Sequence, residues 1–304
     1  MRGALTIRGP APVHADGRFA PSPTGTLHLG NLRTALLAWL FARAAGARFL
    51  VRLEDLDTGR VRPGIAEGQL ADLAGLGLCW DGPVVRQSER HALYAEALVA
   101  LERAGLIYPC WCTRSEIRAA ASAPHGPLPD GAYPGTCRDL PAAELALRQR
   151  SGRPTALRVR ADGVREAFVD RLCGPVEGVV DDFVVRRSDR AYAYNLAVVV
   201  DDAQQEVGEI VRGADLLEST PRQRWLQRTL GLPEPGYAHV PLLLSDDGHR
   251  IAKRDATEAR GDLAAPQLRG ILASGVGLAE PGEAPSLDTL ITRMRTLLAT
   301  EVTA

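Results

Sequence analysis

A proline- and glycine-rich stretch at residues 17–31 places the strongest constraint on the fold, because such a stretch forms neither a helix nor a central strand. The residues that follow it, 32–45, contain no proline or glycine, and their apolar side chains recur every three or four positions. This spacing predicts a helix with one buried face, closed by Gly46 as its C-terminal cap. Residues 48–53 then predict a short strand that ends in the acidic cluster 54–57.

The order of loop, helix and strand places a glycine-containing loop at the N-terminus of a helix. Unsatisfied N–H groups and a partial positive charge suit that end of a helix to an anion such as phosphate. Gly30 would let the backbone approach a ligand closely, and His28 could donate a hydrogen bond to a phosphate oxygen. The alternative is an ordinary turn in which His28 caps the helix or lies on the surface.

Length and composition indicate a globular protein of the cell interior. The 304 residues suit a main domain with one or two appendages, and the net charge of -1 gives no general sign of nucleic-acid binding. No apolar run approaches the length of a membrane span, and residues 1–15 lack the apolar core of a signal peptide. Five unevenly placed cysteines argue against a disulfide framework. We therefore expect a cytoplasmic protein without membrane contact.

Apolar spacing along the rest of the chain predicts alternating helices and strands. Helices are expected at 65–78, 89–105 and 286–300, the last of them capped by Ser286. Strand-like segments occur at 155–160 and 179–185, and 195–202 is a helix or a strand that returns to the main sheet. This alternation predicts a parallel sheet with helices on its faces, and such sheets bind ligands at the carboxyl ends of their strands, where the topology reverses.

Three cysteines have the spacing of metal ligands. Cys110 and Cys112 are one residue apart, and Cys137 follows in the same part of the chain. Thiolates are good zinc ligands, and three of them leave one position, for which Tyr133 and His125 are candidates. The alternative is three free cytosolic thiols. Cys79 and Cys173 have no such neighbours and are predicted to be core thiols.

Two stretches together resemble the signatures of the class I glutamyl-tRNA synthetases. Residues 18–31, RFAPSPTGTLHLGN, resemble the first signature, with Asn31 in its last place. Residues 250–254, RIAKR, resemble the second, with arginine for its first lysine and alanine for its serine, and would otherwise be read as a solvated turn. Lys253 is the only lysine in the chain. The resemblance implies that His28, Gly30, Asn31 and Lys253 bind ATP, that His28 and Lys253 are catalytic, and that the phosphates hold Mg2+.

The same resemblance implies a glutamate pocket. Its residues would be Arg18, Ser22, Glu54, Tyr194 and Arg212. Arginine suits this task because its planar fork binds a carboxylate through two parallel hydrogen bonds, and Glu54 would take the ammonium group. Taken singly, each residue also fits a surface or structural role. Which arginine takes which carboxylate stays open.

The cysteine spacing resembles one truncated branch of that family, the glutamyl-Q tRNA(Asp) synthetases. In this branch Cys-x-Cys accompanies Tyr-x-x-x-Cys, as in residues 133–137, which implies Tyr133 as the fourth ligand of a structural zinc ion. After Lys253 the sequence continues only to residue 304, which is room for two or three helices but not for an anticodon-binding domain. The resemblance implies that glutamate is activated without tRNA and then esterified to queuosine in the anticodon of tRNA(Asp).

The expected fold is therefore α/β. It comprises a loose tail (1–16), a Rossmann-like nucleotide-binding domain in two halves (17–107 and 188–240), an inserted zinc-containing acceptor-type subdomain (108–187), and the second-signature loop with a short helical C-terminal region (241–304). The expected partners are L-glutamate, ATP and queuosine-containing tRNA(Asp), bound by a monomer. Alternatives are a minimal synthetase that charges the 3′ end of tRNA and an inactive tRNA-binding paralogue. Arginines at 148, 150, 153, 158, 160 and 165 form either a tRNA contact strip or a solvated face.

Overall fold

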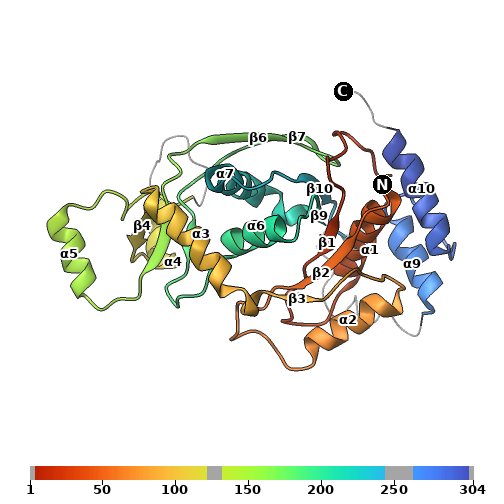
Figure 1. Cartoon of the computed structure of the whole chain (residues 1–304), viewed down its shortest axis with the longest axis horizontal. Helices are drawn as coiled ribbons and strands as arrows, with labels where there is room; N and C mark the ends of the chain where they lie inside the picture. Colours follow the sequence, from red (N-terminus) through yellow and green to blue (C-terminus); the bar gives the residue numbers. More distant parts are fainter. Residues whose placement is uncertain (1–3, 122–131, 244–262, 301–304) are drawn as a thin grey trace.

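Five parallel strands form the central sheet of the computed structural model, which describes residues 4–121, 132–243 and 263–300 (Figure 1). The strand order is β10-β9-β1-β2-β3, and the neighbours pair in parallel as the sequence predicts. The strands are β1 (Gly17–Phe19), β2 (Phe49–Leu53), β3 (Val85–Arg86), β9 (Glu209–Gly213) and β10 (Gly236–Val240). Because the chain extends from β1 to one side first and returns later on the other, the topology reverses between β1 and β9.

Along each strand the side chains alternate between two faces of the sheet. One face is apolar, and the other carries charged residues near the carboxyl ends of the strands. Phe19, Val51, Val211 and Val240 belong to the core that α1 (Leu29–Ala44) completes. Leu50, Ile210 and Tyr237 form a smaller cluster on the opposite face. Side chains alternate along a strand, so the residues on this second face at the carboxyl ends are Arg18, Arg52, Arg212 and His239.

Helices cover both faces of the sheet (Figure 1). α9 (Ala265–Ser274) and α10 (Leu287–Ala299) pack against α1, and Ser286 caps α10 as predicted. On the second face lies α6 (Tyr194–Gln204), which confirms the helical alternative for 195–202, together with α3 (His91–Arg103) and α7 (Thr220–Leu230). The remaining helices are α2 (Ile65–Gly75), α4 (Arg114–Ala121), α5 (Ala142–Arg150) and the 3-10 segments η1 (Gln87–Glu89) and η2 (Ala214–Ser219). Among the helices of these described ranges, none combines the length and apolarity needed to cross a bilayer.

A second, antiparallel sheet contains β4 (Ile107–Cys110), β5 (Ala156–Val159) and β8 (Val184–Arg186). β6 (Arg165–Asp170) and β7 (Gly174–Val179) form a hairpin that packs against α7 and β10. The strand expected at 179–185 is wrong, because β7 ends at Val179 and β8 begins at Val184. The two carboxylates between them bond elsewhere: Asp181 accepts from Arg222, and Asp182 accepts from the Tyr108 hydroxyl at 2.7 Å. The division of the chain into domains stays a prediction.

The N-terminal segment is not a loose tail where the structure describes it. The Leu5 and Ile7 side chains are buried in the core beneath α1, with Ile7 only 1% exposed. The Leu5 N–H donates to the Val276 carbonyl at 3.0 Å, and the Arg8 N–H donates to the Arg171 carbonyl at 2.8 Å. The sequence prediction fails here because the apolar partners of this short segment lie far along the chain.

If the segment is part of the core, Ile7→Ala should lower the free energy of unfolding by about 2–4 kcal/mol, since it leaves a cavity beside α1. Val13→Ala is the matched control on the same segment, because Val13 is 97% exposed, and it should change stability by less than about 0.5 kcal/mol. Urea unfolding measures both. Equal stabilities of the two variants would contradict the packing of this segment.

Candidate active site

A cavity of about 540 Å³ lies at the carboxyl ends of β1 and β9, where the sheet topology reverses. Its walls are the loop after β1, the N-terminus of α1, the start of α6 and the segments after β9 and β10. The described residues that the sequence assigns to ATP or glutamate all line it: Arg18, Ser22, His28, Gly30, Asn31, Glu54, Tyr194 and Arg212. Lys253 lies outside the described residues. The fold therefore brings residues from distant parts of the chain to one cavity.

His28 both caps α1 and lines this cavity, so the two interpretations of this residue are compatible. Its Nδ1 accepts from the Asn31 N–H at 3.2 Å, and the Asn31 side-chain oxygen accepts from the His28 N–H at 3.3 Å. Because Nδ1 is an acceptor here, the neutral ring carries its proton on Nε2. This reciprocal cap starts α1 at Leu29, earlier than the expected start at residue 32.

Gly30 makes room for the His28 ring. A Cβ atom at residue 30 would lie 3.0 Å from both Cε1 and Nδ1 of His28, which is closer than a side chain normally allows. The sequence suggests that this glycine admits a ligand to the backbone, and the structure adds that it admits the imidazole. A glycine at this position therefore avoids a tight contact with the imidazole that caps the helix.

Gln69 and Arg33 line the cavity but were missed by sequence reasoning. Gln69 of α2 donates to the carbonyls of Ser22 (3.1 Å) and Gly25 (2.7 Å), and so holds the loop after β1. Arg33 of α1 donates to the Pro241 carbonyl, and burial lowers its pKa to about 10. Neither residue belongs to a recognisable local motif, because each acts on a segment that is distant in sequence.

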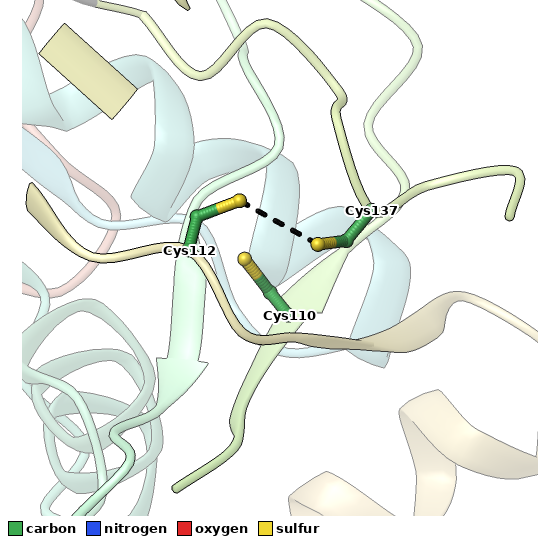
Figure 2. A group of neighbouring side chains, drawn as sticks. All are labelled: Cys110, Cys112 and Cys137. Atoms are coloured by element: carbon green, nitrogen blue, oxygen red, sulfur yellow. Dashed lines mark hydrogen bonds between the residues drawn. The ribbon is translucent and has the colours of Figure 1, made fainter. Parts of the chain in front are cut away.

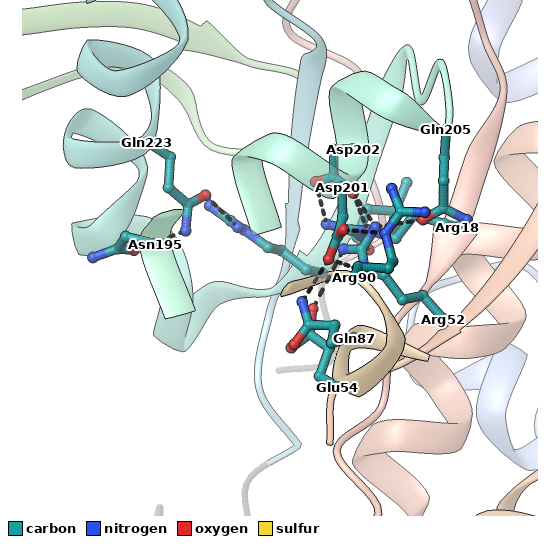
Figure 3. Close-up of polar contacts among 12 residues, drawn as sticks. Arg18, Arg52, Glu54, Gln87, Arg90, Asn195, Asp201, Asp202, Gln205 and Gln223 are labelled. Atoms are coloured by element: carbon teal, nitrogen blue, oxygen red, sulfur yellow. Dashed lines mark hydrogen bonds and ion pairs between the residues drawn. The ribbon is translucent and has the colours of Figure 1, made fainter. Parts of the chain in front are cut away.

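A buried charge cluster forms the floor between the sheet and α6 (Figure 3). Arg18 donates from Nε (3.1 Å) and Nη2 (3.2 Å) to both oxygens of Asp202, and Arg52 donates to the same carboxylate at 2.8 Å. Burial alone would raise the pKa of Asp202, but the two guanidinium groups hold it below its usual range. Burial raises the pKa of Glu54, against the opposing effect of Arg52 and Arg18. The fork of Arg18 is thus engaged by a protein carboxylate.

The neighbouring Asp201 fastens α3 to α6 (Figure 3). Its carboxylate accepts from Arg90 Nε at 2.6 Å, from Gln87 Nε2 at 2.7 Å and from the Tyr94 hydroxyl at 2.8 Å. Asp201 is completely buried, so these donors replace the water that it loses. Asp202 therefore bonds toward the sheet, while the hydrogen bonds of Asp201 connect α6 to α3 and its ion pair with Arg52, at 3.6 Å, joins the two carboxylates in one cluster.

Arg212 has a different environment from Arg18. It is 4% exposed and donates to three uncharged groups: His239 Nε2 (3.1 Å), Gln223 Oε1 (2.7 Å) and Thr220 Oγ1 (2.8 Å). No carboxylate of the described residues forms an ion pair with it within 4.0 Å. A buried cation that pairs with no described carboxylate, on the wall of a cavity, favours an anionic ligand.

The predicted metal-ligand cysteines lie together beside the second sheet (Figure 2). The sulfur atoms of Cys110, Cys112 and Cys137 are all within 4.8 Å of one another. The Tyr133 hydroxyl lies 3.4 Å from the Cys110 sulfur and 3.5 Å from the Cys112 sulfur. His125, the other candidate ligand, lies outside the described residues. Three thiols and a phenol around one point are a donor set that fits a metal ion.

The prediction of core thiols at Cys79 and Cys173 is wrong, because both residues are exposed. Cys79 follows the turn after α2, and Cys173 lies in the turn between β6 and β7. Turns run over the protein surface, where their backbone groups can bond water.

The six arginines considered as a tRNA strip are mostly engaged by neighbouring groups. Arg148 pairs with Glu144 at 2.7 Å, Arg153 with Glu116 at 3.3 Å and Arg160 with Asp139 at 2.8 Å. Arg165 pairs with Glu177, and Arg158 donates to the Cys110 sulfur at 3.3 Å and to the Asp182 carbonyl at 2.6 Å. The four arginines at 148, 153, 160 and 165 pair with carboxylates, which favours the solvated-face alternative for them. The buried Arg158 fits neither alternative.

Comparisons with known proteins agree with this geometry. The family model described as tRNA synthetases class I (E and Q), catalytic domain, matches residues 14–283. The glutamyl-Q tRNA(Asp) synthetase of Nocardia farcinica is 60% identical over 88% of this chain and 86% of its own length. The protein of that name from Symbiobacterium thermophilum is 51% identical over 85% of this chain and 81% of its own length.

Two solved structures share the fold. A glutamate tRNA ligase from Elizabethkingia meningosepticum in complex with its amino acid matches with a TM-score of 0.74 and 27% identity, over 91% of this chain and 64% of that chain. Glutamate-tRNA synthetase from Elizabethkingia anophelis matches with a TM-score of 0.75 and 28% identity, over 91% of this chain and 65% of that chain. The chain thus spans just under two thirds of the length of either structure.

The charge cluster predicts a large effect of Asp202→Asn. This change leaves Arg18 buried without its carboxylate and removes the shortest of the three ion pairs of Arg52, so it should lower the free energy of unfolding by about 3–5 kcal/mol at pH 7. The folded pKa of Asp202 is depressed, so its contribution is present above pH of about 4 and is lost as pH falls through the folded pKa. Denaturant unfolding measured from pH 7 to pH 3 tests both statements.

Asp189→Asn is the control for this series, because Asp189 pairs with Arg187 on the surface and its side chain is 53% exposed. It should cost less than about 1 kcal/mol at any pH. A loss for Asp202→Asn no larger than that of the control would contradict the role of the cluster.

Proposed function

The chain belongs to the class I synthetase family for glutamate and glutamine, within it to the glutamyl-Q tRNA(Asp) synthetases, and from this membership we propose that it transfers glutamate to the queuosine base of tRNA(Asp). The membership makes the chain a ligase. The proposed route is the activation of glutamate by ATP, without tRNA, to give glutamyl-adenylate, and then transfer of the glutamyl group to a hydroxyl of queuosine in the anticodon. We also propose that the chain acts as a monomer in the cytoplasm.

The environment of Arg212 is the observation that carries the glutamate proposal. Its buried guanidinium has no protein carboxylate among the described residues and faces a cavity that also contains Glu54 and Tyr194. We assign the side-chain carboxylate of glutamate to Arg212 and its ammonium group to Glu54. An approaching ammonium ion favours the charged form of Glu54, whose pKa burial has raised. The α-carboxylate is then left for the N-terminus of α1, where ATP would bind.

The activation step needs positioning rather than a general base. The α-carboxylate of glutamate is ionised at neutral pH and attacks the α-phosphorus of ATP, while the bond from that phosphorus to pyrophosphate breaks. We propose that the N-terminus of α1, with His28 Nε2–H, Gly30 and Asn31, binds the phosphate charge. Lys253 neutralises the departing pyrophosphate, and Mg2+ held by the phosphates supplies further neutralisation.

Glutamate-dependent ATP–pyrophosphate exchange in the absence of tRNA tests the activation step. We expect the wild-type chain to catalyse it, and Lys253→Ala to slow it by about a hundredfold, roughly the loss of one preorganised donor, with an unchanged melting temperature. Asp189→Asn serves as the unaffected control. The same rate for Lys253→Ala and the wild type would refute the role of Lys253, and no exchange at all would favour the inactive paralogue.

The site of transfer is read from tRNA labelled with radioactive glutamate and digested with nuclease. Label in the anticodon fragment of tRNA(Asp) supports the proposed acceptor. Label in the 3′-terminal fragment would instead indicate a minimal synthetase that charges the end of tRNA. Mapping the label is preferable to treating the tRNA with periodate. Periodate attacks cis-diols, and because queuosine and the 3′ end both carry one, it does not distinguish the two acceptors.

We propose that the cluster of Cys110, Cys112, Tyr133 and Cys137 binds one structural Zn2+ ion. The purified protein should contain about one zinc per chain by elemental analysis, because four protein ligands form a closed tetrahedral site. Cys137→Ser should lose most of this metal, whereas Cys173→Ser, an exposed thiol outside the cluster, should retain it. Full zinc content in the Cys137→Ser protein would rule out the site.

A further inference from the structure

His239 lies beside Arg212 and cannot be protonated on the nitrogen that faces it. The two residues are register partners on the parallel strands β10 and β9. Nε of Arg212 lies 3.1 Å from Nε2 of His239. A guanidinium N–H can only donate, so Nε2 is the acceptor and the ring proton belongs on Nδ1. The Thr220 hydroxyl lies 3.1 Å from the same Nε2 atom.

Asp170, at the end of β6, fixes that tautomer. Its Oδ2 lies 2.6 Å from Nδ1 of His239, and neither residue has any exposed surface. Its other oxygen accepts from the backbone N–H groups of Leu172 (2.9 Å), Cys173 (2.8 Å) and His239 (3.2 Å), so the carboxylate is held in place. Burial lowers the pKa of His239, which agrees with a neutral ring between a carboxylate and a guanidinium.

We propose that Asp170 and His239 are positioning residues that orient Arg212 toward the substrate carboxylate while leaving its charge available, an inference that rests on the proposed function. The chain of contacts runs from the Asp170 carboxylate through the neutral imidazole to the guanidinium. The imidazole accepts the hydrogen bond from Arg212 Nε and so fixes the orientation of the guanidinium. It also keeps the Asp170 carboxylate one ring width away from the charge of Arg212. Together with Gln223 and Thr220 it uses one N–H on each guanidinium nitrogen, so each terminal nitrogen keeps a second N–H for a ligand.

Arg18 shows the alternative arrangement in the same cavity. Two of its nitrogens bond Asp202 directly, so its charge is already compensated by the protein. A carboxylate placed directly on Arg212 would compete with the substrate in the same way. The imidazole spacer therefore holds Arg212 without compensating its charge, whereas Asp202 compensates the charge of Arg18.

Three variants test the proposal in the glutamate-dependent exchange assay. His239→Gln places an amide oxygen near the position of Nε2, which preserves the acceptor for Arg212. His239→Asn places its amide near Nδ1, which preserves only the contact with Asp170. Asp170→Asn can present an amide donor to Nδ1, so that the proton moves to Nε2 and opposes the Arg212 N–H. We expect His239→Asn and Asp170→Asn to raise the KM for glutamate about tenfold, and His239→Gln to raise it less.

The KM for ATP and kcat should stay within about twofold of the wild type, because only the orientation of Arg212 changes. Glu209→Gln is the matched control. It breaks the buried ion pair between Glu209 and Arg171, the residue that follows Asp170, and does not alter the contacts of the imidazole. It should therefore leave the KM for glutamate unchanged. An unchanged KM for glutamate in folded Asp170→Asn, or an equal rise in the KM for ATP, would overturn the proposal.

If Asp170→Asn does not fold, the two His239 variants decide, and an equal KM for glutamate in both overturns the proposal. Circular dichroism and melting temperature show which variants are folded. A wild-type protein without glutamate-dependent exchange would refute the proposed function itself, and this inference with it. An active wild type with insensitive variants would refute the positioning role alone.

Discussion

The pairing of Arg18 and Arg52 with Asp202 is the interaction on which the position of α6 depends. Ions of this size lose several kcal/mol of hydration on burial, and only close pairing recovers it. The geometry that satisfies Asp202 therefore determines where the helix lies on the sheet, and Asp201 transmits the same constraint to α3. The first residue of α6, Tyr194, lines the cavity, so one wall of the site is set by charges buried at the other end of the same helix.

The alternation of strand side chains explains how one sheet provides both a core and a site. One face packs mainly against α1 through apolar residues such as Phe19 and Val51. The other face is apolar only where the strands begin, around Leu50 and Ile210, and it carries charges where they end. Parallel strands place all these charged ends at one edge, next to the N-terminus of α1. The site is thus a direct result of the parallel topology and of a period of two.

Local patterns in the sequence predicted α1, α2, α3, α10 and the parallel sheet, but not α4, α5, α7 or α9. The residues that meet in the cavity were identified through the family resemblance. Local patterns were insufficient wherever a partner is distant: Asp202 lies 184 residues from Arg18, and Asp170 lies 69 residues from His239. The burial of the segment around Ile7 and of Gln69 was not predicted, for the same reason. The predicted burial of Cys79 and Cys173 was wrong because apolar character predicts burial only on average. Turns place both residues at the surface. The His28–Gly30 spacing was visible, but its steric reason required coordinates.

The distribution of charge around the cavity bears on how a synthetase of this kind could separate glutamate from glutamine. The two amino acids share the ammonium group and the α-carboxylate, so Glu54 and the N-terminus of α1 offer no means of discrimination. Under the proposed assignment Arg212 does, because a neutral amide would leave its buried guanidinium without an anionic ligand. Rejection by an unpaired buried group is far stronger than rejection by shape. That selectivity requires the protein itself to leave Arg212 uncompensated, and a neutral imidazole between Arg212 and Asp170 meets this requirement while holding the guanidinium in one orientation.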